Sequence, residues 1–182
     1  MPKSFTNKAT NVLNKSLYLA SELGHTYIGS EHLLLALTSE KDSVAAKLLE
    51  ARGVGFDNTR DAICRRVGAG ERTRITPRDM TPRTKRIIEN AAIQSSRFGQ
   101  TYIGTEHLLL AILMDSESAA VSLLRATGCD IQRIANALSA EVSGIKKQQN
   151  PNVVNVKVKF NEPELENDEE EIFGAKSGGG SG

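Results

Sequence analysis

Apolar residues recur along most of the chain at the spacing of helices that bury one side. Val12, Leu13, Leu17, Ala20 and Leu23 form one such stripe, with about 3.6 residues per turn. Glycine, serine, threonine or aspartate stands where each stripe begins or ends, as at helix caps. The pattern predicts an all-α fold. The helices are expected at about 6–23, from 30, at 43–52 and from 57, then at 81–98, from 105, at 118–127 and from 130.

The helical pattern is written twice. GHTYIGSEHLLLA at 24–36 recurs as GQTYIGTEHLLLA at 99–111, identical at eleven of thirteen positions with an offset of 75 residues. The offset also matches Thr6 with Thr81 and Gly53 with Gly128. Such a unit is expected to bury its apolar face against its copy. We therefore predict a domain at 1–144 with eight helices in two four-helix repeats, about 3–68 and 80–143, related by a pseudo-twofold axis. The exposed loop 68–79 joins them.

Helix ends within the repeats are also predicted. Ser30 and Thr105 are expected to cap the second helix of each repeat, and Gly24 and Gly99 to end the first. Pro82 suits the first position of a helix, where its missing N–H is not needed.

The segment 145–182 has no helical period, and it contains an acidic run and a GGGSG end. Val153, Val154, Val156 and Val158 could alternate as one edge strand, but an isolated strand is only marginally stable. We therefore expect a flexible linker, with the edge strand as the alternative.

Composition narrows the class of protein. Aromatic residues make up 4% and tryptophan is absent, so aliphatic side chains must fill the core, which favours helix-on-helix layers. The net charge is +1 with both signs dispersed, which does not indicate nucleic acid or membrane partners. Cys64 and Cys129 lie outside any CxxC motif, so buried reduced thiols are expected rather than a disulfide. No signal core and no stretch of ~20 apolar residues is present, which favours the cytosol.

No catalytic or metal site is predicted. GAKS at 174–177 lacks the glycines and the strand–helix context of a phosphate-binding loop. The histidines, His25, His32 and His107, do not form an HExxH pair one helical turn apart. A small hydrolase with a site assembled in space remains the remote alternative.

The duplicated TYIGxEH motif has a structural and a functional interpretation. Glu31 and Glu106 stand in the first turn of a helix, where the helix dipole alone favours a carboxylate. A carboxylate there could also bind a guanidinium through two hydrogen bonds.

The helices led by Thr6 and Thr81 carry nearby cations: Lys8 in one copy, Arg83 and Lys85 in the other. A basic helix start suits phosphate, although a solvated helix face would explain the same cations. Together the two motifs would suit a phosphorylated arginine.

FTNKATNVL, the paired GHTYIGSEHLLLAL and GQTYIGTEHLLLAI, and TPRTKRIIENA closely resemble the double Clp-N repeat of the Hsp100/Clp unfoldases, most of all the ClpC type. The resemblance covers about 3–143. It implies an eight-helix domain that precedes two AAA+ modules, which use ATP and Mg²⁺. This chain contains no Walker motif, so we expect an N-domain with part of its linker and no cofactor of its own.

The resemblance also implies a function. ClpC-type N-domains receive substrates and adaptor proteins and pass substrates through a hexameric ATPase to the ClpP protease; this fragment alone should be monomeric. In several relatives each repeat binds phosphoarginine, with the glutamate of the EH pair on the guanidinium and a threonine on the phosphate. Motif matching pairs Glu31 with Thr6 and Glu106 with Thr81, with Arg83 and Lys85 as phosphate neighbours.

A peptide or adaptor face is implied where the first helices of the two repeats meet. Its expected members are Phe5, Lys8, Met80 and Glu89. The competing hypothesis is a free-standing peptide-binding adaptor with no ATPase in the same chain.

Overall fold

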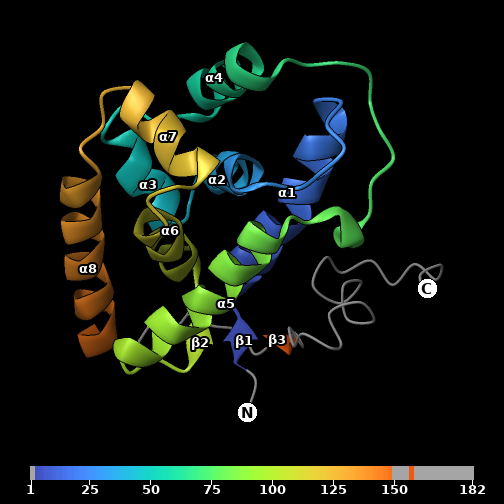
Figure 1. The fold of residues 1–182 in the computed structure, drawn as a ribbon. Helices are drawn as coiled ribbons and strands as arrows, with labels where there is room; N and C mark the ends of the chain where they lie inside the picture. Colours follow the sequence, from blue (N-terminus) through green and yellow to red (C-terminus); the bar gives the residue numbers. More distant parts are fainter. Residues whose placement is uncertain (1–2, 149–155, 158–182) are drawn as a thin grey trace.

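The computed structural model describes residues 3–148 and 156–157, and Figure 1 shows two helical halves side by side. The first half contains α1 (Asn7–Glu22), α2 (Ser30–Ser39), α3 (Val44–Glu50) and α4 (Phe56–Val67). The second contains α5 (Pro82–Arg97), α6 (Thr105–Met114), α7 (Ala119–Ala126) and α8 (Ile131–Gln148). Short strands β1 (Ser4–Phe5), β2 (Tyr102–Ile103) and β3 (Val156–Lys157) and a 3₁₀ turn, Pro77–Asp79, complete the described part. The predicted all-α class with two four-helix repeats is confirmed.

The first helix of each half begins and ends where the sequence predicts. The side-chain oxygen of Thr6 accepts a hydrogen bond from the Ala9 N–H at 3.0 Å and caps α1. Thr81 caps α5, which opens on Pro82. Gly24 follows α1 with a φ of +83°, a left-handed conformation that favours glycine.

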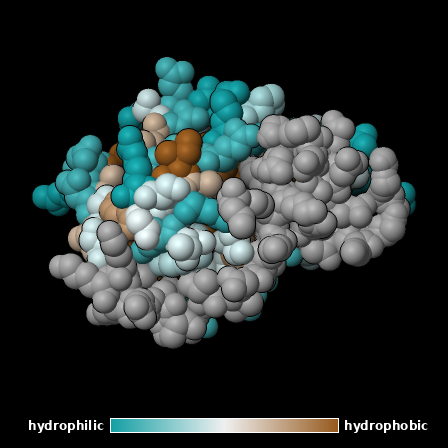
Figure 2. All heavy atoms as spheres, turned by 90° about the horizontal axis from the view of Figure 1, so that it is seen from below, coloured by the Kyte–Doolittle hydropathy of each residue, from teal (hydrophilic) through white to brown (hydrophobic). Residues whose placement is uncertain are grey.

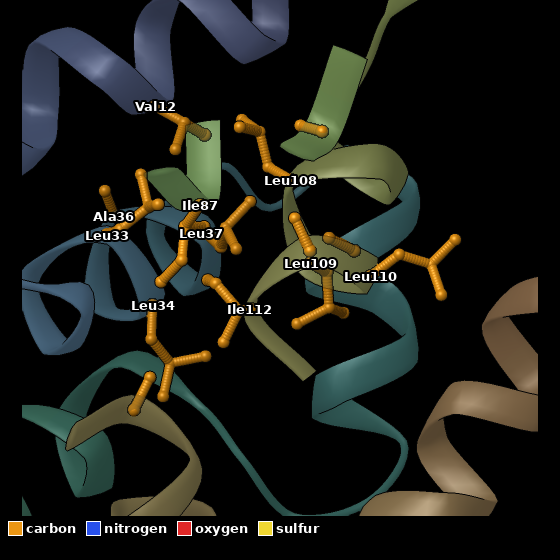
Figure 3. Packing of buried hydrophobic residues seen from close by; sticks show 14 of the residues in the cluster. Val12, Leu33, Leu34, Ala36, Leu37, Ile87, Leu108, Leu109, Leu110 and Ile112 are labelled. Carbon is orange, nitrogen blue, oxygen red and sulfur yellow. The ribbon is translucent and has the colours of Figure 1, made fainter. Parts of the chain in front are cut away.

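Helices α2 and α6 form the centre of the molecule. Nearly every residue of each is buried, including the polar ones at its start. Each contacts helices of both halves: α2 touches α3, α4, α6 and α7, and α6 touches α7, α8, α2 and α3. Exchanging the halves reproduces this set of contacts, as a pseudo-twofold axis requires. Figure 3 shows Leu34 and Leu37 of α2 approaching Ile112 of α6 in this core.

The halves exchange their N-terminal residues. β1 runs parallel to β2, with Phe5 opposite Ile103. The equivalent pair in the other half, Met80 and Ile28, forms a parallel bridge. Each repeat therefore pairs the residue before its first helix with the TYIG segment of the other repeat. The repeat pattern did not predict this exchange.

The exchange corrects the predicted peptide face. The side chains of Phe5 and Met80 are only 1% and 5% exposed, because their backbone pairs with the other half and draws them into the core. Neither can present an apolar surface to a partner. Lys8 is partly buried and Glu89 is exposed, so these two remain accessible members of that face.

The C-terminal segment departs from a plain linker where it is described. α8 runs to Gln148, beyond the predicted domain end at 144. Val156–Lys157 form β3, which pairs antiparallel with β1 on the side opposite β2. The edge-strand alternative therefore holds at these two residues, because β1 supplies a partner edge. Val153, Val154 and Val158 lie outside the described residues.

The prediction that Ser30 and Thr105 cap the second helix of their own repeats is wrong. Both are the first residue of their helix rather than its cap. The Ser30 hydroxyl instead accepts from the Ala120 N–H of α7 at 3.0 Å, and the Thr105 hydroxyl accepts from the Ala45 N–H of α3 at 3.4 Å. Each hydroxyl thus serves the start of a helix in the opposite repeat.

The joining loop 68–79 is largely exposed, as predicted, yet it is anchored to the first half: the Thr73 N–H donates to the Ser21 carbonyl at 3.1 Å. Cys64 and Cys129 are free thiols, but both are partly exposed rather than buried. No single helix of the described residues is long and apolar enough to cross a membrane, although α6 and α7 together, bent by 86°, meet the same test of length and composition.

Replacing Ser30 with alanine should lower the free energy of unfolding by about 1–3 kcal/mol, the usual cost of leaving a buried donor without its hydrogen-bond partner. The buried Ala120 N–H would lose the Ser30 hydroxyl as an acceptor. Urea unfolding followed by circular dichroism measures the change. Ser122→Ala, on the same helix α7 but outside this contact, is the control. Equal stability of Ser30→Ala and the natural chain would contradict a stabilising hydrogen bond between Ser30 and Ala120.

Candidate functional site

The histidine of each EH pair caps its own helix. The Gly29 N–H donates to His32 Nδ1 at 2.9 Å, and the Gly104 N–H donates to His107 Nδ1 at 2.9 Å. Because Nδ1 accepts, the neutral ring carries its proton on Nε2. That nitrogen faces His25 Nδ1 at 2.7 Å in the first half and the Gln100 side-chain oxygen in the second. With both ring nitrogens engaged, neither histidine is available as a base or metal ligand.

Burial keeps these two rings uncharged. Desolvation lowers the pKa of His32 and of His107 to about 3, and the positive charge of Lys3 adds to the effect at His107. The sequence pattern predicted no role for these histidines. Their position three residues after the capping glycine is the signal that could have identified it.

Glu31 and Glu106 are buried although both are acids. They are 4% and 3% exposed, and each carboxylate folds back over the glycine that precedes the helix. A Cβ on Gly29 would lie 2.5 Å from Glu31 Oε1, and one on Gly104 would lie 2.6 Å from Glu106 Oε1. Any larger residue at these positions would therefore displace the carboxylate from the place it now occupies.

The exchange of strands also exchanges the predicted partners of the glutamates. The Thr6 N–H donates to the Ile103 carbonyl at 2.9 Å, so the start of α1 lies beside the segment that carries Glu106. The Thr81 N–H donates to the Ile28 carbonyl at 3.0 Å, which places the start of α5 beside Glu31. Motif matching paired each glutamate with the threonine of its own repeat, and the structure pairs it with the other.

Two candidate sites follow from this arrangement. The Glu106 site consists of Thr6, Lys8 and Glu106, and the Glu31 site consists of Thr81, Arg83 and Glu31. Each combines a buried carboxylate from one repeat with a threonine-capped helix start and a cation from the other. Lys85 lies one turn into α5, partly buried, at the position that Thr10 occupies in α1.

The carboxylate of Glu106 is incompletely satisfied. Burial raises its pKa and Glu141 raises it further, while hydrogen bonds to the Glu106 backbone and Thr105 and the charge of Lys8 lower it. Its Oε2 atom is buried without a hydrogen-bond partner among the described residues. Such an atom costs free energy until a donor reaches it.

The cations of the two sites have different partners. Arg83 Nη1 lies 2.6 Å from Asp115 Oδ1, an ion pair. Lys8 Nζ donates to the Asp42 carbonyl at 3.2 Å, and within the described residues it makes no ion pair with a carboxylate. Lys8 is therefore more available than Arg83 to form an ion pair with an incoming anion.

Near Glu89 the helices α5 and α6 border a shallow groove of about 420 Å³, where Ile93 and Met114 are 54% and 51% exposed. Charged side chains, among them Arg86 and Asp115, surround these apolar residues. The face seen from below in Figure 2 likewise mixes hydrophilic side chains with a small hydrophobic spot.

The fold defines a class of double-repeat helical domains that other proteins share. The N-terminal domain of the chaperone ClpD from Arabidopsis thaliana superimposes with a TM-score of 0.66 at 23% identity, over 78% of this chain and 96% of that one. A ClpV N-domain in complex with a VipB peptide has a TM-score of 0.57 at 19% identity, over 77% and 88%.

Similarity in sequence identifies the family to which the chain belongs. Residues 4–127 and 79–162 match the Clp repeat (R) N-terminal domain. The chloroplastic chaperone protein ClpC2 of Arabidopsis thaliana is 35% identical over 134 residues, which are 74% of this chain and 14% of that protein. The chain belongs to the Clp repeat N-terminal domain family and has ClpC-type relatives, of whose length it spans a small part.

The buried histidines predict how stability depends on pH. Their folded pKa, about 3, lies below the ordinary value of 6.5, so the unfolded chain takes up protons first. Stability should therefore be full above pH 6.5 and fall as the pH drops from 6.5 towards 3, by up to about 1.4 kcal/mol per pH unit for each histidine.

His107→Asn should remove the share of this slope that His107 contributes. Asparagine can keep the cap, because the Asn58 side-chain oxygen already accepts from the Gly55 N–H at the same position of α4. Urea unfolding between pH 7 and pH 4.5 gives the slope of stability against pH for the natural chain and for the variant. A loss of stability from the smaller side chain that does not depend on pH leaves this slope unchanged. Identical slopes would show that His107 is charged or accessible in the folded state.

Proposed function

We propose that this chain is the substrate- and adaptor-docking domain of a ClpC-type AAA+ unfoldase that supplies the ClpP protease. Membership of the Clp repeat family and similarity to ClpC2 support the type of parent protein. The ClpV N-domain, which shares the fold, binds a VipB peptide, and this supports a peptide-receiving role for the fold here.

We further propose that the two sites bind phosphoarginine on client proteins. The observation that carries this is the buried Glu106 Oε2, which lacks a hydrogen-bond donor among the described residues. A guanidinium presents a planar fork of N–H donors that matches a carboxylate. The threonine-capped start of α1 and Lys8 offer N–H groups and a positive charge to the phosphate on the same side chain.

The two sites would act together on a client that carries several marks. Binding at one site turns binding at the second into an intramolecular step, which raises the apparent affinity without any new contact. A domain with two copies of one weak site suits clients with several marks better than those with one.

Calorimetric titration with free phosphoarginine tests the proposal. The natural chain should bind, and Glu31→Gln combined with Glu106→Gln should weaken binding by at least about tenfold, since each loses a charge-assisted hydrogen bond. Glu71→Gln, an exposed carboxylate of the joining loop outside both sites, is the matched control and should bind like the natural chain.

Arginine and phosphoserine serve as comparison ligands, because each carries only one of the two groups that the sites are proposed to recognise. Both should bind more weakly than phosphoarginine. Absence of heat with the natural chain, or unchanged affinity in the double variant, would refute phosphoarginine recognition.

A further inference from the structure

We propose that Tyr27 makes the two sites unequal: it occupies the Glu31 carboxylate, so that a guanidinium binds first at Glu106. This inference rests on the proposed function, because it ranks the same two sites. Four observations support it: the hydrogen bond of Tyr27, the free oxygen of Glu106, the backbone pairing that separates the two tyrosines, and the partners of the cations.

The Tyr27 hydroxyl donates a hydrogen bond to Glu31 Oε2 at 2.8 Å. The ring is held in place by stacking on His25, with 5.8 Å between centroids and an interplanar angle of 3°. Its Cε2 atom lies 3.1 Å from the point where a Gly29 Cβ would be, so the ring also covers this glycine. Desolvation and the contact with Glu31 raise the pKa of Tyr27, so the phenol keeps its proton and remains a donor.

Glu106 is oriented differently. Both of its carboxylate oxygens lie near the position of a Gly104 Cβ, at 2.6 and 2.9 Å, whereas the nearest atoms to a Gly29 Cβ are Glu31 Oε1 at 2.5 Å and then Glu31 Cδ and Tyr27 Cε2 at 3.1 Å. The second oxygen of Glu106 has no hydrogen-bond partner among the described residues. Glu106 Oε2 therefore has no donor to release when a guanidinium binds, whereas Glu31 Oε2 must first release the Tyr27 hydroxyl.

The backbone explains why equivalent tyrosines differ. Tyr102 belongs to β2 and pairs with Ser4 of β1, and it is 6% exposed. In the other half the Ile28 N–H donates to the Asp79 carbonyl at 2.9 Å and Ile28 bridges Met80, but Asp79 belongs to the 3₁₀ turn and the bridge does not extend to Tyr27. Tyr27 thus lies outside the paired residues, and its partly exposed ring can lie over Gly29.

The cations of the two sites also differ in their partners. Arg83 of the Glu31 site is paired with Asp115, whereas Lys8 of the Glu106 site makes no carboxylate pair within residues 3–148. The ion pair with Asp115 thus occupies one cation of the Glu31 site. Lys85 on the same helix makes no ion pair within the described residues, so the ranking depends mainly on the two carboxylates.

Carboxyl ¹³C NMR of the full chain, labelled at glutamate Cδ, resolves the two sites separately. With methylguanidinium as the probe, the Glu106 signal should shift at a roughly tenfold lower concentration than the Glu31 signal, about the contribution of one hydrogen bond to a charged group. Tyr27→Phe removes only the donor and should bring the two midpoints to within about threefold. Tyr102→Phe, the matched control, should leave their ratio unchanged.

Equal midpoints in the natural chain, or a ratio that Tyr27→Phe does not alter, would overturn the role of Tyr27. Repeating the titration with phosphoarginine separates the two proposals. If methylguanidinium shows the ranking but phosphoarginine does not bind, the ranking stands and the proposed function fails. If phosphoarginine binds both glutamates equally with or without the Tyr27 hydroxyl, the function stands and the ranking fails; a chain that binds neither probe refutes both.

Discussion

The exchange of two short backbone pairings between the repeats is the constraint on which the rest of this structure depends. Phe5 pairs with Ile103 and Met80 pairs with Ile28, so neither half completes its N-terminal end alone. The same pairings draw two large side chains into the common core and set each threonine-capped helix beside a carboxylate of the other half. The candidate sites are therefore features of the interface between the repeats, and a single repeat would carry neither.

The buried centre decides which polar groups can serve a ligand. Helices α2 and α6 are enclosed on all sides, so each polar group at their starts needs a partner within the protein. The histidines cap the helices from within and the Ser30 and Thr105 hydroxyls bond across the repeats. Glu106 is the member of this set with an unsatisfied oxygen among the described residues, and the proposed binding of a guanidinium there rests on this atom.

The segments that connect the repeats make the duplicated sites differ. In one half the residues before the first helix are extended and pair on both sides, with β2 and with β3. In the other half they follow a 3₁₀ turn. Tyr27, unlike Tyr102, lies outside the bridged residues, and its hydroxyl donates to Glu31. Near-identical motifs thus make different local contacts in the two repeats, and this difference is the basis of the proposed ranking of the two sites.

The sequence by itself determined the helices, their ends at Thr6, Gly24 and Thr81, and the duplication, because these depend on local hydrogen bonds and on apolar spacing. It also identified both glutamates as candidates. Only the tertiary structure decided which threonine lies beside which glutamate and that Phe5 and Met80 are buried. The physical reason is that the repeats offer nearly the same residues to any partner, so local pattern cannot distinguish pairing within a repeat from pairing between repeats. The path of the chain through the shared core determines that each segment pairs with the other repeat.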